Sequence, residues 1–408
     1  MENPKIRFKG FTKDWEQRKL IDYLEVSSEK NRDNRFTKED VLSVSGEYGI
    51  VNQIEFQGRS FAGASVSNYG VVENGDVVYT KSPLKSNPYG IIKTNKGIPG
   101  IVSTLYAVYK PKEITDSKFV QIYFELDSRM NSYMHPLVNK GAKNDMKVSA
   151  ENALKGMVSF PKKDEQEMIS LYFSTIDHLI TLHQRKCEQT KKLKKYMLQK
   201  MFPQNGAKVP EIRFDGFTYD WEQRKVSEIT KFHKQGFYTT EEYDNSKKYY
   251  LLRGTDLTEN KLVLKDTPKI DATEKDYDAF KTEIGDFLIV RSGTVGTYGI
   301  VDVDIPAIFG SYLIDFRFDM EQVTNEFFGY FYQSSLFKSQ LNKIIQASAN
   351  TNINAENIKS TVISLPSLNE QRRISEYLGN LDNLITLHQR KCDELKKMKK
   401  YMLQNMFI

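Results

Sequence analysis

The sequence predicts an α+β protein in which two mixed α/β domains alternate with two long helices. Three observations support this class. The chain repeats its own ends, two stretches carry a helical apolar stripe almost free of helix breakers, and the segments between them mix short strand-like and helix-like runs. The predicted order is a first domain, a first long helix, a linker, a second domain and a second long helix. Their bounds are 1–160, 161–202, 203–210, 211–365 and 366–408.

Two pairs of segments are nearly identical at an offset of half the chain. KIRFKGFTKDWEQRKL (5–20) matches EIRFDGFTYDWEQRKV (211–226) at 12 of 16 positions. ITLHQRKCEQTKKLKKYMLQKMF (180–202) matches ITLHQRKCDELKKMKKYMLQNMF (385–407) at 18 of 23 positions. Between these duplicated ends, which we call the frame, only short motifs such as Gly-Asp and AEN recur. A duplication without functional logic does not explain why divergence is confined to the middles. The pattern favours shared mechanical work for the frame and two different recognition tasks for the middles.

Each long helix is predicted to begin just after a proline, Pro161 or Pro366, that is followed by polar and acidic residues. Apolar residues then recur at alternating spacings of three and four, which is the pattern of a helix-packing seam. The seam residues are Ile169, Tyr172, Ile176, Leu179, Ile374, Tyr377, Leu381 and Leu384, and Leu193, Met197, Leu395, Met398 and Met402 continue the stripe. A helix of this length, roughly 55 Å, cannot bury such a stripe alone. We therefore expect the two copies to pack on each other.

The middles read as mixed α/β structure. Strand-like runs occupy 71–80, 101–109, 286–291 and 307–318, and helix-like runs occupy 117–126 and 325–341. The segment PQNGAKVP (203–210) is the one clear linker, because its proline and glycine residues end the first long helix.

The composition restricts the class of protein. There are 59 basic and 53 acidic residues, a net charge of +6, which favours nucleic acid only slightly. No apolar run is long enough to cross a membrane and no signal-peptide core is present, so we expect a cytoplasmic protein without a membrane. Cys187 and Cys392 are better explained as small buried thiols than as a disulfide. His183 and His388 lie one turn before them, and packing explains this spacing better than metal ligation.

No enzyme motif is evident. The sequence has no dinucleotide-binding GxGxxG opening a βαβ unit and no phosphate-binding GxxxxGK[ST]. Asn87-Pro88-Tyr89 is similar to the NPPY loop of amino-methyltransferases, but it lacks the second proline and no methyl-donor motif precedes it. The sequence therefore predicts a non-catalytic chain with neither cofactor nor metal of its own.

The complete pattern resembles the specificity subunit of Type I restriction–modification systems. The residues that carry the resemblance are an opening RFxGFxxxWEQRKL, a variable middle, a proline followed by EQ on a long helix, and a helix end LKKYMLQKMF, with the whole set then recurring. The resemblance covers essentially the whole chain. It implies two target recognition domains, each reading one half-site in the major groove, and two antiparallel helices that form a coiled-coil spacer with pseudo-twofold symmetry.

The resemblance also implies the partners. These are double-stranded DNA, two modification subunits that carry S-adenosylmethionine and methylate adenine, and restriction subunits that use ATP and Mg²⁺ as motor-nucleases. Two different middles imply an asymmetric bipartite target. A rigid spacer implies a fixed distance between the half-sites.

Polar and basic loops between strand-like runs are the candidate DNA contacts, because phosphates attract cations and base edges bind donors and acceptors. In the first domain they are Ser45, Tyr48, Lys81, Ser82, Lys85, Ser86, Asn87, Tyr89, Lys140, Lys143 and Asn144. In the second domain they are Arg253, Thr255, Arg291, Ser292, Thr294, Ser348, Asn350 and Asn352. For any one residue an ordinary solvated loop explains the sequence equally well. Arg253 and Arg291 are the strongest candidates, because arginine can bind guanine through two hydrogen bonds.

Two alternatives stay open from the sequence. A coiled-coil scaffold could present two protein-binding domains, and a stand-alone methyltransferase would need the methyl-donor motif that is missing. The basic helix ends also allow two interpretations: they face the DNA backbone, or they form a solvated surface near the modification subunit. We favour the second, because Met and Tyr residues between the lysines resemble contact residues. The lysines are Lys191, Lys192, Lys194, Lys195, Lys396, Lys397, Lys399 and Lys400.

Overall fold

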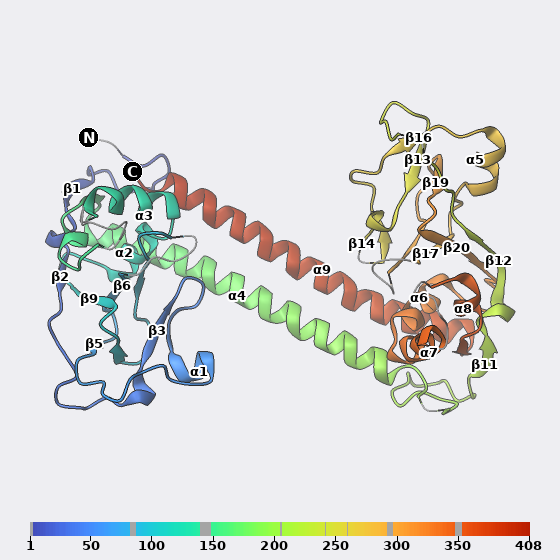
Figure 1. Ribbon diagram of the computed structural model, residues 1–408, viewed down its shortest axis with the longest axis horizontal. Helices are drawn as coiled ribbons and strands as arrows, with labels where there is room; N and C mark the ends of the chain where they lie inside the picture. Colours follow the sequence, from blue (N-terminus) through green and yellow to red (C-terminus); the bar gives the residue numbers. More distant parts are fainter. Residues whose placement is uncertain are drawn as a thin grey trace. The chain divides into compact units, whose positions relative to one another are not determined.

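The chain forms two compact units (Figure 1). The computed structural model describes residues 3–81, 87–138, 148–204, 206–240, 242–258, 260–291, 297–346 and 353–408. Unit 1 consists of residues 1–184 with 389–408, and unit 2 consists of residues 185–388. Each unit therefore holds one variable middle, the first part of one long helix and the last part of the other.

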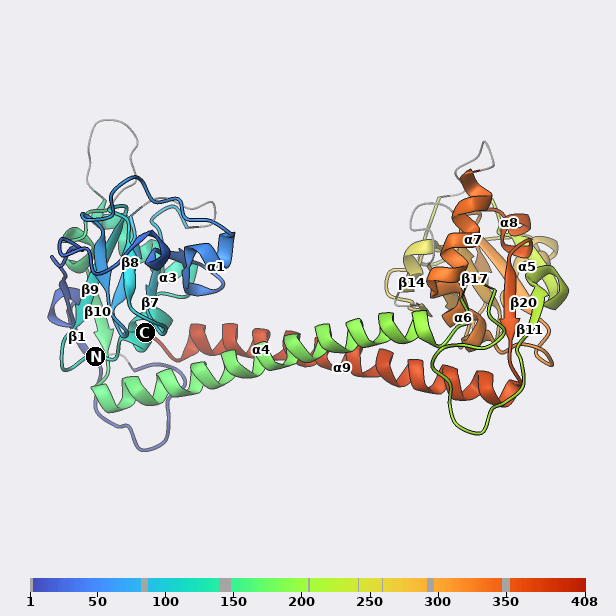
Figure 2. The ribbon, with the colours of Figure 1, turned by 90° about the horizontal axis from the view of Figure 1, so that it is seen from below.

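The two long helices are α4 (Lys163–Lys200) and α9 (Leu368–Asn405), each of 38 residues. They are the green and red helices of Figures 1 and 2. At 1.5 Å per residue each is about 57 Å long. Pro161 and Pro366 lie two residues before the helices, and Gly379 does not interrupt α9. The two predicted long helices are confirmed.

Unit 1 is built around an antiparallel sheet in the order β2-β9-β6-β7. Its strands are β2 (Leu24–Val26), β6 (Val77–Thr80), β7 (Ile92–Thr94) and β9 (Tyr106–Pro111). Three further pairs are β1 (Glu16–Lys19) with β10 (Met157–Phe160), β3 (Leu42–Ser45) with β4 (Gly49–Asn52), and β5 (Gly70–Val72) with β8 (Gly100–Val102). The helices of its middle are α1 (Gln53–Gln57), α2 (Ser117–Tyr123) and α3 (Asp127–Met134), with short 3-10 turns η1 (Leu20–Asp22), η2 (Lys38–Asp40), η3 (His135–Leu137) and η4 (Asn152–Leu154).

Unit 2 has a larger sheet in the order β12-β20-β17-β18-β15-β14. Its strands are β12 (Thr230–Gln235), β14 (Leu257–Thr258), β15 (Lys261–Leu262), β17 (Phe287–Val290), β18 (Tyr298–Ile300) and β20 (Leu313–Phe318). A second sheet, β16-β13-β19, contains β13 (Tyr249–Leu252), β16 (Lys269–Ile270) and β19 (Ala307–Phe309), and β11 (Glu222–Lys225) pairs with β21 (Val362–Leu365). The helices of this middle are α5 (Glu274–Phe280), α6 (Asn325–Gln333), α7 (Ser335–Gln346) and α8 (Ala355–Lys359), with 3-10 turns η5 (Val226–Ile229) and η6 (Gly254–Asp256).

The mixed α+β class is confirmed, and the structure divides several predicted runs. The predicted strand 71–80 is two strands, because Gly75 turns the chain between β5 and β6 with φ 89°. The predicted strand 307–318 is β19 and β20. The predicted helix 325–341 is α6 and α7, because the Ser334 hydroxyl accepts the Phe337 N–H and starts a new helix.

Each unit has one main core that joins its middle to both long helices. In unit 1, Ile169 and Phe173 of α4 pack with Met406 and Phe407, which follow α9. In unit 2, the α9 residues Ile374, Leu378 and Leu381 pack with Met201 and Phe202, which follow α4. Within each unit the beginning of one long helix therefore lies beside the end of the other, and the helices run antiparallel.

This arrangement corrects part of the predicted seam. Ile169, Ile176, Ile374 and Leu381 are all buried. Of these, Ile169, Ile374 and Leu381 pack in the cores of the middles. Tyr172, Leu179 and Tyr377 are half-buried. Leu384 is exposed, as are Leu193 and Met398 farther along. The physical reason is that a domain core, as well as a partner helix, covers the apolar face where each long helix begins.

Both cysteines are buried and neither forms a disulfide, as expected. Cys187 and Cys392 are 3% and 2% exposed. The Cys187 thiol lies 3.9 Å from the Ile385 carbonyl, which accepts its weak hydrogen bond.

Candidate nucleic-acid interface

The duplicated frame closes each middle in the same way. Strand β1 pairs with β10 so that Glu16 lies opposite Phe160, and β11 pairs with β21 so that Glu222 lies opposite Leu365. The pairing joins the entry and exit of each middle directly before a long helix. The loops of the middles are therefore presented from a common base.

A buried glutamate at the start of each long helix fastens the opening segment. In unit 1, Glu165 accepts hydrogen bonds from Arg7 Nε and Nη2 at 2.7 Å, and from Trp15 Nε1 at 3.4 Å. This hydrogen-bonded glutamate raises the pKa of the Arg7 guanidinium. Bidentate charge-assisted bonds of this kind are stronger than neutral ones and fix the geometry.

Unit 2 repeats this contact. Glu370 accepts from Arg213 Nε at 2.7 Å and Nη2 at 2.8 Å, and from Trp221 Nε1 at 3.3 Å. Glu165 and Glu370 are 2% and 1% exposed. The arginine and tryptophan of the duplicated opening therefore have a structural role, which the repeat alone did not reveal.

The glutamine after each glutamate connects the long helix to its middle. Gln166 donates to the Pro161 carbonyl at 2.9 Å and accepts the Asp116 N–H at 2.9 Å. Gln371 donates to the Pro366 carbonyl at 3.0 Å and accepts the Thr324 N–H at 2.9 Å. Asp116 and Thr324 are the residues that cap α2 and α6. We call Glu165 with Gln166, and Glu370 with Gln371, the EQ clamps.

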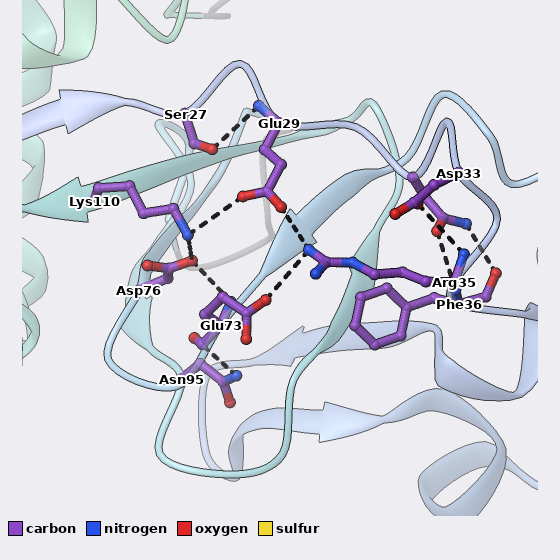
Figure 3. A network of polar contacts seen from close by, with 10 residues as sticks. Ser27, Glu29, Asp33, Arg35, Phe36, Glu73, Asp76, Asn95 and Lys110 are labelled. Atoms are coloured by element: carbon purple, nitrogen blue, oxygen red, sulfur yellow. Dashed lines mark hydrogen bonds and ion pairs between the residues drawn. The ribbon is translucent and has the colours of Figure 1, made fainter.

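The recurring Gly-Asp motif shapes the turn that leads into the central strand of each sheet. Asp76 accepts the Glu73 N–H at 2.8 Å and Lys110 Nζ at 2.8 Å. In Figure 3, Lys110 contacts Asp76, and Arg35 lies between Glu29 and Glu73. The network holds the 27–36 segment against β6 and β9.

Unit 2 contains the same turn with different surroundings. Asp286 accepts the Glu283 N–H at 2.7 Å and Arg317 Nη2 at 3.2 Å. Arg317 also lies 3.6 Å from Asp315, which is 0% exposed. Burial, then the charge of Asp286, raises the pKa of Asp315 to about 8. The position of Asp315 in β20 corresponds to Val108 in β9.

Lys81, the first predicted contact in the long loop of unit 1, lies just after β6. It is half-buried, and its burial together with the charge of Lys30 lowers its pKa. Within the described part of the chain, the Lys81 ammonium has no salt bridge with a carboxylate. Lys81 therefore stays a candidate phosphate contact.

At the far end of the same loop the structure corrects one prediction. Asn87 is 7% exposed, and its amide donates to Asp127 at 2.6 Å. An internal bond of this kind orders the chain before α3, so Asn87 does not present its amide to a base edge. Tyr89 is half-buried, and its hydroxyl lies 2.8 Å from His135 Nδ1. This contact places the end of the first predicted loop (81–89) beside the segment that precedes the second predicted loop (139–144).

Ser45 and Tyr48 lie at the β3–β4 turn. The Ser45 hydroxyl accepts the Tyr48 N–H at 3.1 Å, which shapes the turn. Tyr48 is 62% exposed and packs against Phe56, with ring centroids 5.3 Å apart. An exposed aromatic ring on a fixed turn can contact a ligand, so Tyr48 stays a candidate.

The two predicted arginines of unit 2, Arg253 and Arg291, differ in their contacts. The Arg253 guanidinium lies 3.3 Å from both carboxylate oxygens of Asp256, and donates to the Asp266 carbonyl at 3.0 Å. Asp256 is buried, so Arg253 neutralises a carboxylate that has no access to water. This internal ion pair argues against Arg253 as a base contact, and the Arg-x-x-Asp spacing is the sequence signal for it. Thr255, between them, is exposed.

Arg291 lies just after β17 and is half-buried. Its guanidinium makes no hydrogen bond or ion pair with the residues that the structure describes. The Arg291 carbonyl accepts the Ile353 N–H at 3.2 Å, which places the end of another predicted loop beside it. A Cβ at Gly254 would lie 3.3 Å from Val290, so the Arg253 turn approaches the same strand end. Three predicted segments therefore meet here.

The remaining predicted contacts lie outside the described residues. They are Ser82, Lys85, Ser86, Lys140, Lys143, Asn144, Ser292, Thr294, Ser348, Asn350 and Asn352. They stay predictions.

Two of the basic helix-end lysines are not surface charges. Lys399 Nζ donates to Glu125 and Asp177, each at 2.6 Å, within unit 1. Lys194 Nζ donates to Asp382 at 2.6 Å and to Gln333 at 2.9 Å within unit 2. These two residues connect each middle to the helices and face neither DNA nor a partner. The other six are Lys191, Lys192, Lys195, Lys396, Lys397 and Lys400, and all six are exposed.

Within the described ranges, no three His, Cys, Asp or Glu side chains lie together in a way that could hold a metal ion. No helix of the described chain is both long and apolar enough to cross a membrane.

Comparisons with known proteins agree with the duplicated fold. Residues 219–397 match the family described as Type I restriction modification DNA specificity domain. A similar protein is the Type I restriction enzyme MjaVIII specificity subunit of Methanocaldococcus jannaschii. It is 24% identical over 331 residues, which are 78% of this chain and 75% of that protein.

Two solved structures share the fold over nearly their full length. The Type I restriction–modification S subunit from M. genitalium matches with a TM-score of 0.61 and 13% identity, over 100% of this chain and 99% of that one. A chain from a study of the assembly and conformational transition of the Type I system matches with a TM-score of 0.52 and 16% identity, over 97% of both chains. Residues 219–397 are thus similar to the Type I specificity domain, and the chain as a whole shares the fold of these two structures.

Proposed function

We propose that the chain is the DNA sequence-specificity subunit of a Type I restriction–modification complex, and that each unit reads one half of an asymmetric bipartite target. One observation carries the proposal. The two units share the same frame geometry, yet the strand ends at which the predicted loops meet carry different side chains. Lys81 stands at this position in unit 1 and Arg291 in unit 2.

The frame geometry supports a division of labour between partners. In this proposal the chain supplies specificity, and two modification subunits and the restriction subunits supply the chemistry. S-adenosylmethionine, ATP and Mg²⁺ would then bind to those subunits and not to this chain. The fold supports this proposal because the buried carboxylates of the frame, Glu165 and Glu370, are used in ion pairs that hold the domains.

Methylation mapping tests the proposal directly. The chain is co-expressed with its modification subunit, and N6-methyladenine is mapped across the host genome by long-read sequencing. We expect one bipartite motif with two different half-sites. If the chain binds only proteins and no motif appears, or if the lone polypeptide transfers methyl groups, the proposal is wrong.

Substitution of the two strand-end cations assigns the half-sites. Arg291→Ala should relax one half-site and leave the other intact, and Lys81→Ala should affect the opposite half-site. Loss of a bidentate arginine–guanine contact costs about 1–3 kcal/mol of discrimination. If methylation instead weakens evenly at every target, the residue contacts phosphate.

The long helices are proposed to set the spacing between the half-sites. An insertion of one helical turn into both α4 and α9, about 5.4 Å, should change the length of the unread spacer in the methylated motif. An unchanged spacer in a folded, active variant would contradict the role of the helices as a ruler.

A further inference from the structure

A four-residue turn lies beside the strand-end cation in both units and was not recognised in the sequence. In unit 1 it is Ser103-Thr104-Leu105-Tyr106, and the Tyr106 N–H donates to the Ser103 carbonyl at 3.0 Å. In unit 2 it is Gly310-Ser311-Tyr312-Leu313, and the Leu313 N–H donates to the Gly310 carbonyl at 2.8 Å. Each turn leads directly into the strand that pairs with the central strand, β9 or β20.

A single backbone bond ties each turn to its cation. The Lys81 N–H donates to the Leu105 carbonyl at 3.1 Å, and the Arg291 N–H donates to the Tyr312 carbonyl at 3.0 Å. The strand registers show that these are the same positions in the two units. Thr80 lies opposite Tyr106, and Val290 lies opposite Leu313.

The third residue of each turn has a large, mainly apolar side chain that is exposed to solvent. Leu105 is 60% exposed and Tyr312 is 66% exposed. One exposed apolar residue on a surface is ordinary. Here the same exposed position is occupied by a large side chain in two middles that otherwise share little sequence. Turns of this kind normally carry Gly, Asn, Asp or Ser, so local turn chemistry does not explain either residue.

The surroundings fit a nucleic acid rather than a second apolar surface. Each exposed residue is held by a backbone hydrogen bond beside a cation, Lys81 or Arg291, that has no salt bridge in the described part of the chain. A hydroxyl residue, Thr104 or Ser311, precedes it. Cations favour phosphates, hydroxyls bond to bases or phosphates, and an apolar group can pack on the thymine methyl group.

We propose that Leu105 and Tyr312 are specificity-determining residues that contact base edges in the major groove, one in each half-site. This inference rests on the proposed function and adds two residues to it. Leu105 has no polar atom, so it selects for an apolar base edge such as the thymine methyl group. Tyr312 offers a ring face and a hydroxyl, so it can also form a hydrogen bond. The difference contributes to the asymmetry of the target.

Methylation mapping of point variants tests the inference. Leu105→Ala and Tyr312→Ala are each co-expressed with the modification subunit, and the methylated motif is determined. Each should lose about tenfold in discrimination at one base position of one half-site, with the other half-site unchanged. Tyr312→Phe separates ring contact from hydrogen bonding, and the exchange pair Leu105→Tyr and Tyr312→Leu should alter the preferred base.

Matched controls are exposed residues of similar size on the same middles. Ile98 is 68% exposed and Tyr238 is 75% exposed, and Ile98→Ala and Tyr238→Ala should leave the motif unchanged. Co-purification with the modification subunit is measured for every variant. Because the altered side chains are exposed, we expect the melting temperature to stay at the wild-type value.

The outcomes distinguish the two proposals. If the wild-type chain yields no bipartite motif, the proposed function itself is wrong. If the wild-type motif is found and both alanine variants keep it, or weaken both half-sites equally, the inference alone is overturned. Loss of co-purification in these variants would also overturn it, because the turns would then be protein-docking elements.

Discussion

Unit 1 and unit 2 have the same frame and different middles, and the comparison separates what holds the protein together from what distinguishes its two halves. The Arg7–Glu165 and Arg213–Glu370 contacts are both 2.7 Å. By contrast, unit 1 has a four-stranded main sheet and unit 2 a six-stranded one in the described residues. Even at matched positions in these sheets, Val108 stands where unit 2 has the buried Asp315.

The difference teaches that the frame tolerates large changes in the middles, because it joins the entry and exit of each middle at one place. Each EQ clamp binds both the opening segment and the cap of a helix in the middle, so the rest of the sheet can be extended without disturbing the long helices. The following predictions test how equal the two frames are and how unequal the two middles are.

The largest effect is expected from breaking an EQ clamp. Glu370→Ala leaves Arg213 without its buried partner, which should lower the free energy of unfolding by about 3–5 kcal/mol. Glu165→Ala should cost the same in unit 1, because the geometry is the same. Urea unfolding measures both.

The control variants for the clamps are Glu376→Ala and Glu167→Ala, which remove exposed glutamates from the same helices. These should change the free energy of unfolding by less than about 0.5 kcal/mol. Clearly unequal costs for Glu165→Ala and Glu370→Ala would show that the two frames are not energetically equivalent.

A smaller and unequal effect is expected for the helix lysines. Lys399→Met leaves two carboxylates, Glu125 and Asp177, facing each other, whereas Lys194→Met leaves one carboxylate and one amide. We expect a loss of about 2–3 kcal/mol for Lys399→Met and about 1–2 kcal/mol for Lys194→Met, since these pairs are partly solvated. Urea unfolding again provides the measurement.

Lys397 and Lys192 are exposed and lie two residues before Lys399 and Lys194, so they provide matched controls. In addition, Glu125→Gln leaves Lys399 with one carboxylate and one amide as partners, as for Lys194 in unit 2. It should therefore reduce the loss of unfolding free energy caused by Lys399→Met. An equal cost for the two lysines would mean that the second carboxylate contributes nothing.

A final effect is expected from pH and is confined to unit 2. The folded-state pKa of Asp315, about 8, lies above its unfolded value near 3.9. Between these values the folded state holds a proton that the unfolded state has lost, so this residue lowers stability as pH rises from about 4 to about 8. Its contribution is level below and above that range.

Replacing the carboxyl with the side chain found in unit 1 removes this dependence. Asp315→Val should raise the free energy of unfolding at pH 8 and flatten its pH profile, as measured by urea unfolding from pH 5 to 9. Asp302→Asn, at an exposed position, should leave the profile as in the wild type. A wild-type profile in Asp315→Val would show that Asp315 is ionised throughout.

The sequence alone determined the duplication, the two long helices and the mixed character of the middles. These features depend on local periodicity, on proline and glycine positions, and on direct comparison of the chain with itself, so no knowledge of distant contacts is needed. The candidate loops around Lys81 and Arg291 were found in the same way, from polar residues after apolar runs. The EQ motif was visible too, but its role was not.

Only the tertiary structure decided which of these polar side chains are available. Asn87 is used by Asp127, 40 residues away, and the arginine partners of the EQ clamps lie 158 and 157 residues away. Leu105 and Tyr312 became visible as a pair only when two strand registers placed them beside Lys81 and Arg291. Such contacts join residues far apart in the chain, and a sequence pattern that extends over a few helical turns carries no information about them.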